Sequence, residues 1–286
     1  MARRLSGKEV NVFLQEQLRP RIARLAEDGI VPTLAMVRVG ADGANLSYER
    51  GATKRLKELG VALHPVVPDA EIGQSELEKQ LAALSEDRSI HGILLLLPPK
   101  NDYSEARLHQ RIAPQKDIDG ARLDSLGKIL AYDADGYVNC AIGAILEFID
   151  YYGIELYGKR VCLLGAGRLI GRPLSILLLQ RKATVTVCNT ATPESEKIAR
   201  HADILIGAAG VPGLIDERYV KKGQIVIDTG TQYVDGKLRG DLDVDAVEEI
   251  LGAYTPTPGG IGSITTTILA KHVVEAAERQ QRSRNE

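Results

Sequence analysis

The stretch Val161-Cys-Leu-Leu-Gly-Ala-Gly-Arg-Leu-Ile-Gly-Arg-Pro173 decides the fold of this 286-residue chain. It starts with a short apolar run, passes through Gly165, Gly167 and Gly171, and leads into an apolar helical pattern over 174–179. Strand, glycine turn and helix build a phosphate-binding crevice, because glycines allow close backbone approach and the helix N-terminus adds partial positive charge. The spacing G-x-G-x-x-x-G is one residue longer than the usual dinucleotide fingerprint, so a structural strand-to-helix turn is the alternative.

Repeated β-α units flank this stretch on both sides. Apolar strand patterns occur at 33–39, 61–67, 92–97, 183–188, 204–209, 224–229 and 253–255, and helical patterns lie between most of them. Such alternation implies parallel sheets covered by helices. We therefore predict an α/β fold of two domains built from β-α units, the second of them Rossmann-like.

The predicted domain boundary lies near residue 150, where one β-α series ends and the glycine motif begins. We expect residues 1–150, joined by a C-terminal helix over 264–286, to form the first domain. Residues 151–263 then form the dinucleotide-binding domain.

Composition excludes several classes of function. The net charge of −2 provides no basic field for nucleic acid. Cys140, Cys162 and Cys188 have neither a paired framework nor a metal-ligand spacing, which fits a reducing cytoplasm. With no signal-like apolar segment and no long apolar span, we expect neither secretion nor membrane insertion.

Three positions can contact a ligand at the ends of predicted elements. Tyr48, near the start of the second helix, can stack on a planar ring or donate a hydrogen bond; alternatively, it is a partly buried aromatic. Asp119, in the turn Lys116-Asp-Ile-Asp-Gly120, can accept hydrogen bonds from a heterocycle or cap the turn. Pro258-Gly-Gly260 can bring bare backbone close to a ligand or form a tight loop before a helix. No histidine lies in a motif that assigns it as a base.

The residues after the strand at 183–188 bear on cofactor choice. An acidic residue at this point favours NAD, but the chain has Asn189-Thr190. We therefore expect NADP, with NAD as the alternative, and Arg168 or Arg172 as partners of a 2′-phosphate. Either arginine can equally be a solvated helix residue.

Five ordered segments resemble the bifunctional methylenetetrahydrofolate dehydrogenase/methenyltetrahydrofolate cyclohydrolase family, and the resemblance extends over nearly the whole chain. Tyr48 followed by Glu58-Leu-Gly60 is similar to the family's folate-site helix. Gly92–Pro98 resembles the family's G-I-L-V-Q-L-P, and Lys116–Gly120 resembles its K-D-V-D-G. Gly165–Pro173 resembles G-R-S-x-x-V-G-x-P, and Pro258–Thr265 resembles P-G-G-V-G-P-M-T.

This resemblance implies hydride transfer from the methylene carbon of methylenetetrahydrofolate to a nicotinamide, followed by hydrolysis of the methenyl product to 10-formyltetrahydrofolate. It implies that Tyr48 and Asp119 are catalytic and bind substrate together with Pro258, Gly259 and Gly260. It also implies a homodimer, and we separately expect no metal site. The expected cofactor-binding residues are Gly165, Ala166, Gly167, Arg168, Gly171, Thr190 and Thr231.

The chain departs from the family pattern at functional positions. The lysine of Y-x-x-x-K is Ala52, and the glutamine that partners it is Leu96. Lys54 cannot take over, because six residues on a helix turn it about 240° from Tyr48. The family's P-C-T-P is Asn139-Cys-Ala-Ile142.

The family assigns that lysine to proton transfer in the cyclohydrolase step, so we expect the dehydrogenase step to survive and the cyclohydrolase step to be impaired. Two alternatives follow from the same departures. The chain can be a non-catalytic folate-binding relative, or a dehydrogenase for a different small substrate that suits a more apolar pocket.

Overall fold

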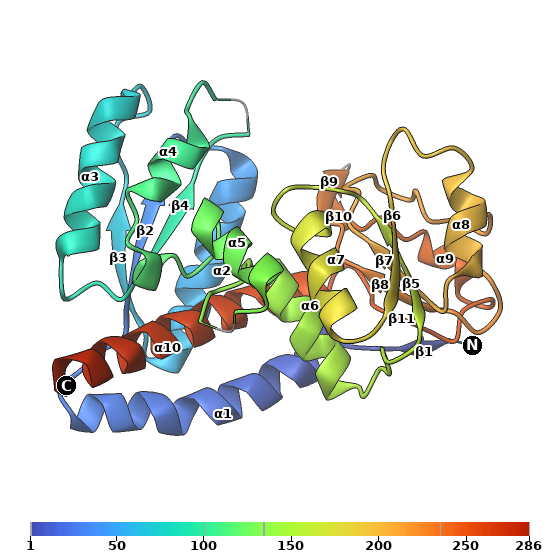
Figure 1. Cartoon of the computed structure of the whole chain (residues 1–286), viewed down its shortest axis with the longest axis horizontal. Helices are drawn as coiled ribbons and strands as arrows, with labels where there is room; N and C mark the ends of the chain where they lie inside the picture. Colours follow the sequence, from blue (N-terminus) through green and yellow to red (C-terminus); the bar gives the residue numbers. More distant parts are fainter. Residues whose placement is uncertain (1, 100, 134, 235, 286) are drawn as a thin grey trace. The chain divides into compact units, whose positions relative to one another are not determined.

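A computed structural model describes residues 2–99, 101–133, 135–234 and 236–285. The chain divides into two compact units, shown in Figure 1. Unit 1 comprises Met1–Val12 and Ala141–Thr265, and unit 2 comprises Phe13–Cys140 and Thr266–Glu286. The boundaries fall within three helices, which are α1 (Gly7–Glu27), α6 (Cys140–Tyr151) and α10 (Thr265–Asn285).

These units differ from the expected domains at the N-terminus and around residue 150. Strand β1 (Arg3–Arg4) pairs in parallel with β11 (Ala253–Tyr254), so the first residues extend the sheet of unit 1. The Tyr152 hydroxyl accepts from the Ser6 amide at 2.9 Å and donates to the Ser6 carbonyl at 2.8 Å. A two-residue strand with exposed arginines carries no alternation that a sequence pattern could reveal. Glu286, the expected end of the last helix, lies outside the described residues.

Unit 2 contains a parallel three-stranded sheet in the order β3-β2-β4. Its elements are β2 (Thr33–Arg38), α2 (Gly43–Leu59), β3 (Ala62–Val66), α3 (Gln74–Glu86), β4 (Gly92–Leu96), α4 (Glu105–Gln110), the 3-10 turn η1 (Pro114–Lys116) and α5 (Leu123–Ala131). The sequence pattern indicated all of these except η1 and α5.

Strand β2 is buried on both faces, as expected for a parallel sheet covered by helices. Ala35 and Val37 pack with Leu77 and Leu81 of α3 and with Leu108 of α4. Leu34 and Met36, which alternate with them, are also buried.

Helix α2 has clear signals at both ends. The Asp42 carboxylate accepts hydrogen bonds from the Ala44 and Asn45 amides, and Gly60 ends the helix with φ +80°. The Asn45 side chain donates to the Leu97 carbonyl at 2.8 Å, which ties the start of α2 to the end of β4.

Unit 1 contains a parallel six-stranded sheet in the order β1-β11-β8-β7-β5-β6. Its other elements are β5 (Arg160–Leu164), α7 (Gly171–Gln180), β6 (Thr184–Cys188), α8 (Ser195–His201), β7 (Ile204–Gly207), β8 (Ile225–Asp228), the hairpin β9 (Gln232–Val234) with β10 (Lys237–Arg239), α9 (Val244–Val247) and the 3-10 turn η2 (Ile261–Ser263).

The order of these strands places a topological switch point beside β5. The chain leaves β5 for β6 on one side and then crosses to β7 on the other. In open α/β sheets, ligands bind beyond the carboxyl ends of the strands at such a point. The glycine motif follows β5 directly, so the topology puts it at the expected ligand-binding edge.

Candidate functional site

The loop after β5 approaches the loop after β7 so closely that only glycine fits at its first position. A Cβ on Gly165 would lie 2.2 Å from the Ala208 carbonyl oxygen, and the residue has φ +119°. A Cβ on Gly171, the first residue of α7, would lie 2.1 Å from the Gly165 carbonyl oxygen. Two of the three motif glycines are thus required by close backbone approach, while the space around Gly167 is open.

A cavity of about 710 Å³ opens over this loop. It is lined by Leu164, Gly165, Ala166, Gly167, Arg172, Cys188, Asn189, Thr190, Thr192, Ser195, Ala208, Ala209, Val211, Leu214 and Tyr219. Within the part of the chain that is described, the backbone amides of Ala166 and Gly167 donate no hydrogen bond. Amide donors that line a cavity close to a helix N-terminus suit a phosphate group.

The opposite wall of the cavity is held by a buried carboxylate. Asp241 accepts hydrogen bonds from the amides of Ala209 at 2.7 Å, Gly210 at 3.2 Å and Val211 at 2.8 Å. The Asp241 amide in turn donates to Asp228 at 3.0 Å. Burial raises the pKa of Asp241 and raises that of Asp228 to about 6, while the amide donors act in the opposite direction.

The cavity includes four of the expected cofactor-binding residues, namely Gly165, Ala166, Gly167 and Thr190. Arg168, Gly171 and Thr231 are not among its described lining residues. Arg172 does line it, and its Nε donates to the Ala166 carbonyl at 3.0 Å.

Sequence reasoning missed the wall at 208–211. The apolar run assigned to a strand over 204–209 ends earlier, at Gly207, so Ala208 and Ala209 belong to the loop. Nothing in the local sequence connects this loop to Asp241, which lies far along the chain.

Gly165→Ala is expected to weaken nicotinamide dinucleotide binding at least about tenfold and to lower Tm, because the new methyl group overlaps the Ala208 carbonyl and requires a strained φ. Fluorescence titration with the reduced dinucleotide and a thermal melt provide the two measurements. Gly167→Ala is the matched control for stability, since a Cβ there meets nothing within 4 Å. Equal Tm values for the two variants would contradict the steric argument.

A second cluster of polar groups lies in unit 2 around Asp119. The half-buried Asp119 carboxylate accepts from the Asn139 side-chain amide at 3.0 Å and from the Cys140 backbone amide at 3.0 Å. Cys140 is the first residue of α6, so this carboxylate lies at a helix N-terminus, where negative charge is favoured. The preceding turn is fixed by His272, whose Nδ1 donates to the Ile118 carbonyl at 2.8 Å.

Burial controls the charge state of this cluster. It raises the pKa of Asp119 to about 6 and raises the pKa values of Tyr48 and Cys140 well above their ordinary values. It lowers the pKa of His272 to about 4. Near neutral pH, Tyr48, Cys140 and His272 are therefore neutral, and Asp119 is the member of this cluster that carries charge.

The positions that depart from the family pattern are apolar in the structure as well. Ala52 has no exposed surface and shares a buried stripe of α2 with Leu56, one turn after the half-buried Tyr48. Lys54 is exposed, as its helical spacing predicted. Leu96, at the end of β4, is partly buried.

The other expected substrate-binding residues, Pro258, Gly259 and Gly260, belong to unit 1, whereas Tyr48 and Asp119 belong to unit 2. The peptide bond before Pro258 is cis, and the Gly259 carbonyl accepts from the Gly7 amide at 2.8 Å. A Cβ on Gly260 would lie 2.4 Å from the Pro256 carbonyl oxygen, so the loop requires glycine there for its own packing.

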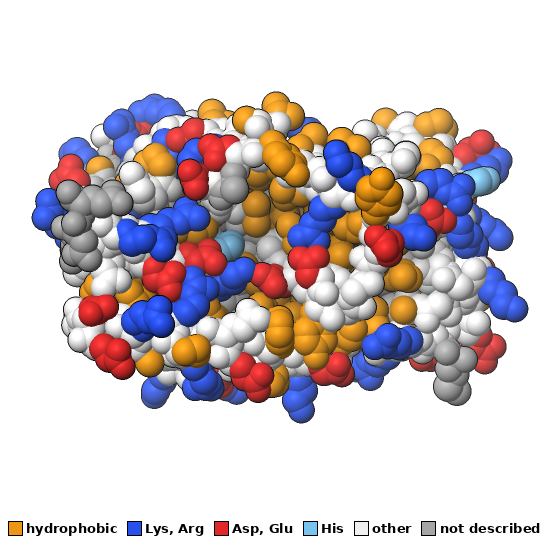
Figure 2. Space-filling view, turned by 60° about the horizontal axis from the view of Figure 1, so that its bottom comes forward, with side chains coloured by type: hydrophobic (Ala, Val, Ile, Leu, Met, Phe, Trp, Pro, Cys, Tyr) orange, Lys and Arg blue, Asp and Glu red, His pale blue; other side chains and the backbone are white. Residues whose placement is uncertain are grey.

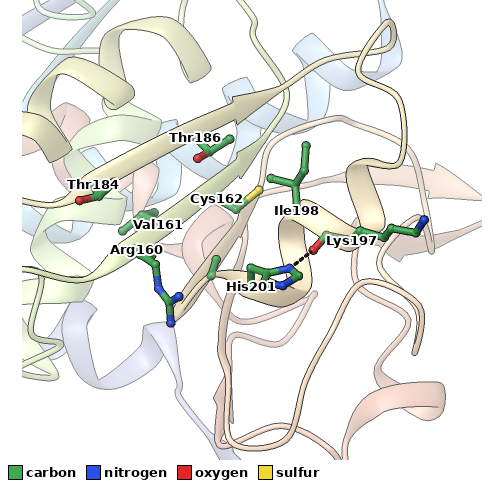
Figure 3. Close-up of a pocket in the computed structure, with 9 residues that line it drawn as sticks. Arg160, Val161, Cys162, Thr184, Thr186, Lys197, Ile198 and His201 are labelled. Carbon is green, nitrogen blue, oxygen red and sulfur yellow. Dashed lines mark hydrogen bonds between the residues drawn. The ribbon is translucent and has the colours of Figure 1, made fainter.

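A separate groove of about 370 Å³ in unit 1 contains none of the expected site residues. Figure 3 shows it between the β5–β6 side of the sheet and α8, with Cys162 and Ile198 on opposite walls. Its Arg160 pairs with Asp203, and the His201 Nδ1 lies 2.6 Å from the Lys197 carbonyl. The Arg160 guanidinium and the His201 imidazole already have partners, so we assign no catalytic role to the groove.

Three further features concern metal-binding clusters, membrane-spanning helices and surface charge. Within the described ranges, no cluster of at least three His, Cys, Asp or Glu side chains is arranged to hold a metal ion. No described helix combines the length and apolar character needed to cross a membrane. On the face shown in Figure 2, basic and acidic side chains are interspersed.

Two family models match the chain, and one of them includes the glycine motif. The model described as "Tetrahydrofolate dehydrogenase/cyclohydrolase, NAD(P)-binding domain" matches residues 139–281. The model for the catalytic domain of the same family matches residues 5–119. The bifunctional protein FolD of Carboxydothermus hydrogenoformans is 41% identical over 281 residues, covering 97% of this chain and 98% of that protein.

Solved structures are similar over the same length. The bifunctional enzyme FolD of Campylobacter jejuni, a methylenetetrahydrofolate dehydrogenase/cyclohydrolase, has a TM-score of 0.94 at 31% identity and covers 98% of this chain and 99% of its own. The Trypanosoma brucei enzyme of the same description, solved with NADP and an inhibitor, has a TM-score of 0.92 at 31% identity, with coverages of 98% and 99%.

Proposed function

The chain belongs to the tetrahydrofolate dehydrogenase/cyclohydrolase family, and from this premise we propose that it oxidises 5,10-methylenetetrahydrofolate to 5,10-methenyltetrahydrofolate with NAD(P) in one-carbon metabolism. One observation carries the proposal beyond the family likeness. The glycine loop at the switch point keeps two amides, those of Ala166 and Gly167, free of any bond within the described chain while they line a cavity.

The cofactor fits the residues that are present. Ala166 and Gly167 would bind the pyrophosphate through their amides, and Gly165 and Gly171 allow the loop to stay compact beneath it. When bound, the nicotinamide supplies the hydride acceptor. The wall over 208–211, fixed by Asp241, excludes water and limits the positions that a ring can take.

The folate side of the reaction rests on Tyr48 and Asp119. The ionised Asp119 accepts hydrogen bonds from the pterin, and the neutral Tyr48 stacks on the ligand or donates to it. Hydride transfer needs no general base in this chain, because its rate depends mainly on how the reacting carbons are oriented. These residues can therefore support the dehydrogenase step without the family lysine.

The cyclohydrolase step does need proton transfer, and few side chains in the described site can carry it out. Ala52 and Leu96 carry no ionisable group, and Lys54 is exposed. His272 is neutral, buried and bonded to a backbone carbonyl. We therefore propose that the methenyl product leaves this enzyme largely unhydrolysed.

Three further properties form part of the proposal. NADP is favoured over NAD because Asn189 and Thr190, rather than a carboxylate, line the cavity beyond β6. A homodimer is supported by β6, an edge strand of its sheet, which offers backbone groups for pairing. The free, buried cysteines Cys140, Cys162 and Cys188 fit a reducing cytoplasm.

Purified protein with methylenetetrahydrofolate is expected to reduce NADP faster than NAD and to accumulate the methenyl product. Reduced nicotinamide can be followed by its fluorescence, the methenyl product by its absorbance after acid has destroyed the reduced nicotinamide, and 10-formyltetrahydrofolate by chromatography. Absence of reduction with either cofactor would overturn the dehydrogenase proposal, and folate binding without turnover would identify a non-catalytic relative. Turnover of other small substrates alone would identify a different dehydrogenase.

A further inference from the structure

The Asp119 carboxylate, which is proposed to bind the pterin, accepts hydrogen bonds from two consecutive residues. Asn139 Nδ2 donates to Asp119 Oδ2 and the Cys140 amide donates to Asp119 Oδ1, each at 3.0 Å. Each carboxylate oxygen keeps a further lone pair for a ligand. Because both oxygens are engaged, the plane of the carboxylate is fixed rather than free to rotate.

The two hydrogen bonds to Asp119 depend on a close approach of two chain segments. A Cβ on Gly120 would lie 2.3 Å from the Tyr137 carbonyl oxygen, so the turn containing Asp119 packs directly on the segment that leads to Asn139. Gly120 also has φ +59°. Cys140 then starts α6, which directs its amide at the carboxylate.

The side-chain donor is a feature of this chain and not of the family pattern. Asn139 stands where P-C-T-P has its first proline, and proline has neither an amide hydrogen nor a polar side chain. The same chain has lost the family's lysine and glutamine, which are Ala52 and Leu96. Asn139 thus provides a donor beside Asp119 in a site that lacks two polar side chains of the family pattern.

We propose that Asn139 is a positioning residue for the folate: its side-chain amide orients Asp119 and keeps it ionised so that Asp119 can accept the pterin's hydrogen bonds. This inference rests on the proposed function, since it assumes that Asp119 binds the pterin. It assigns Asn139 an effect on substrate binding rather than on the hydride-transfer step.

Three other side chains of this cluster are uncharged near neutral pH. Tyr48, Cys140 and His272 are neutral there, so none of them provides a positive charge. The nearby Asp117 carboxylate raises the pKa of Asp119 further, although burial is the larger cause. Hydrogen bonds from the Cys140 amide, the Cys140 thiol and the Asn139 side-chain amide oppose these effects, because each favours the charged form.

Asn139→Leu is the main test, because it keeps the size of the side chain and removes the donor. We expect KM for methylenetetrahydrofolate to rise about tenfold with little change in kcat, since a hydrogen bond to a charged group is lost. The acid limb of kcat/KM against pH, which follows the Asp119 pKa of about 6, should move upward. The sign follows from removing a donor that favours the ionised form.

Two further variants separate positioning from a structural effect. Asn139→Gln retains an amide donor and is expected to keep the acid limb closer to that of the parent than Asn139→Leu does. Gln280→Ala is the matched control, since it removes an amide on α10 that donates to the Arg88 carbonyl at 2.8 Å in a solvent-exposed hydrogen bond. It should leave KM and the pH profile unchanged.

The outcomes distinguish this inference from the proposed function. An unmoved acid limb in Asn139→Leu overturns the inference, whether or not activity falls, because a structural role would lower activity without shifting that limb. If the parent enzyme fails to oxidise methylenetetrahydrofolate at all, the proposed function itself fails. Thermal melts of all variants establish that folded proteins are being compared.

Discussion

Ala52→Lys combined with Leu96→Gln is expected to raise the rate of methenyltetrahydrofolate hydrolysis by about 10²–10⁴-fold, the usual contribution of a positioned general acid or base. Position 52 lies one helical turn after Tyr48 on the buried stripe of α2, so a lysine there enters the same region as the proposed folate-binding residues. The glutamine supplies a polar partner for the buried amine. Disappearance of methenyl absorbance in the absence of cofactor measures the effect.

The controls for the variant with Ala52→Lys and Leu96→Gln test side-chain size and buried charge separately. Ala52→Met with Leu96→Met adds bulk without acid-base chemistry and should leave hydrolysis at the parent rate. Ala52→Lys alone is expected to lower Tm, because it buries an ammonium group without its polar partner. If the double variant folds and still hydrolyses no faster than the parent, the missing activity has a cause other than these two residues.

Asp241→Ala is expected to weaken dinucleotide binding by about 100-fold or more and to lower Tm by roughly 10 °C. The change removes the acceptor for the amides of Ala209, Gly210 and Val211. Leaving a buried donor unsatisfied costs about 1–3 kcal/mol, so leaving three amide donors without their acceptor has a large effect. The wall of the cofactor cavity would then lose its fixed position.

Asp150→Ala serves as the matched control in the same unit. Asp150 is an exposed carboxylate whose partner is Arg181, and pairs of this kind contribute at most about 1 kcal/mol. Dinucleotide titration and thermal melts of both variants are the measurements. A fall in Tm no larger for Asp241→Ala than for Asp150→Ala would contradict the proposed role of the buried carboxylate.

The cofactor cavity was only partly accessible to prediction. The glycines after β5 mark one wall, because a strand, a glycine cluster and an apolar helix follow one another along the chain. The opposite wall over 208–211 has no such signature. It depends on Asp241, whose amide donates to Asp228 at the end of β8, the strand that pairs with β7 in the sheet.

The folate-binding residues are likewise predicted only in part by the sequence. Tyr48 and Asp119 were singled out from their places at a helix start and in a polar turn, and the family resemblance gave each a proposed role. That Asp119 is held by Asn139 and Cys140, and that its pKa is raised to about 6, depends on burial and on contacts across the fold.

The sequence by itself determined the α/β class, most element boundaries and the family, because these depend on local periodicity, turn residues and motifs of a few consecutive positions. Only the tertiary structure decided that the first residues extend the sheet of unit 1, that Gly165 must be glycine because of Ala208, and that Asp241 fixes the cavity wall. The physical reason is common to all three: each depends on a contact with the backbone of a segment distant in the chain, and such contacts leave no periodic pattern in either segment.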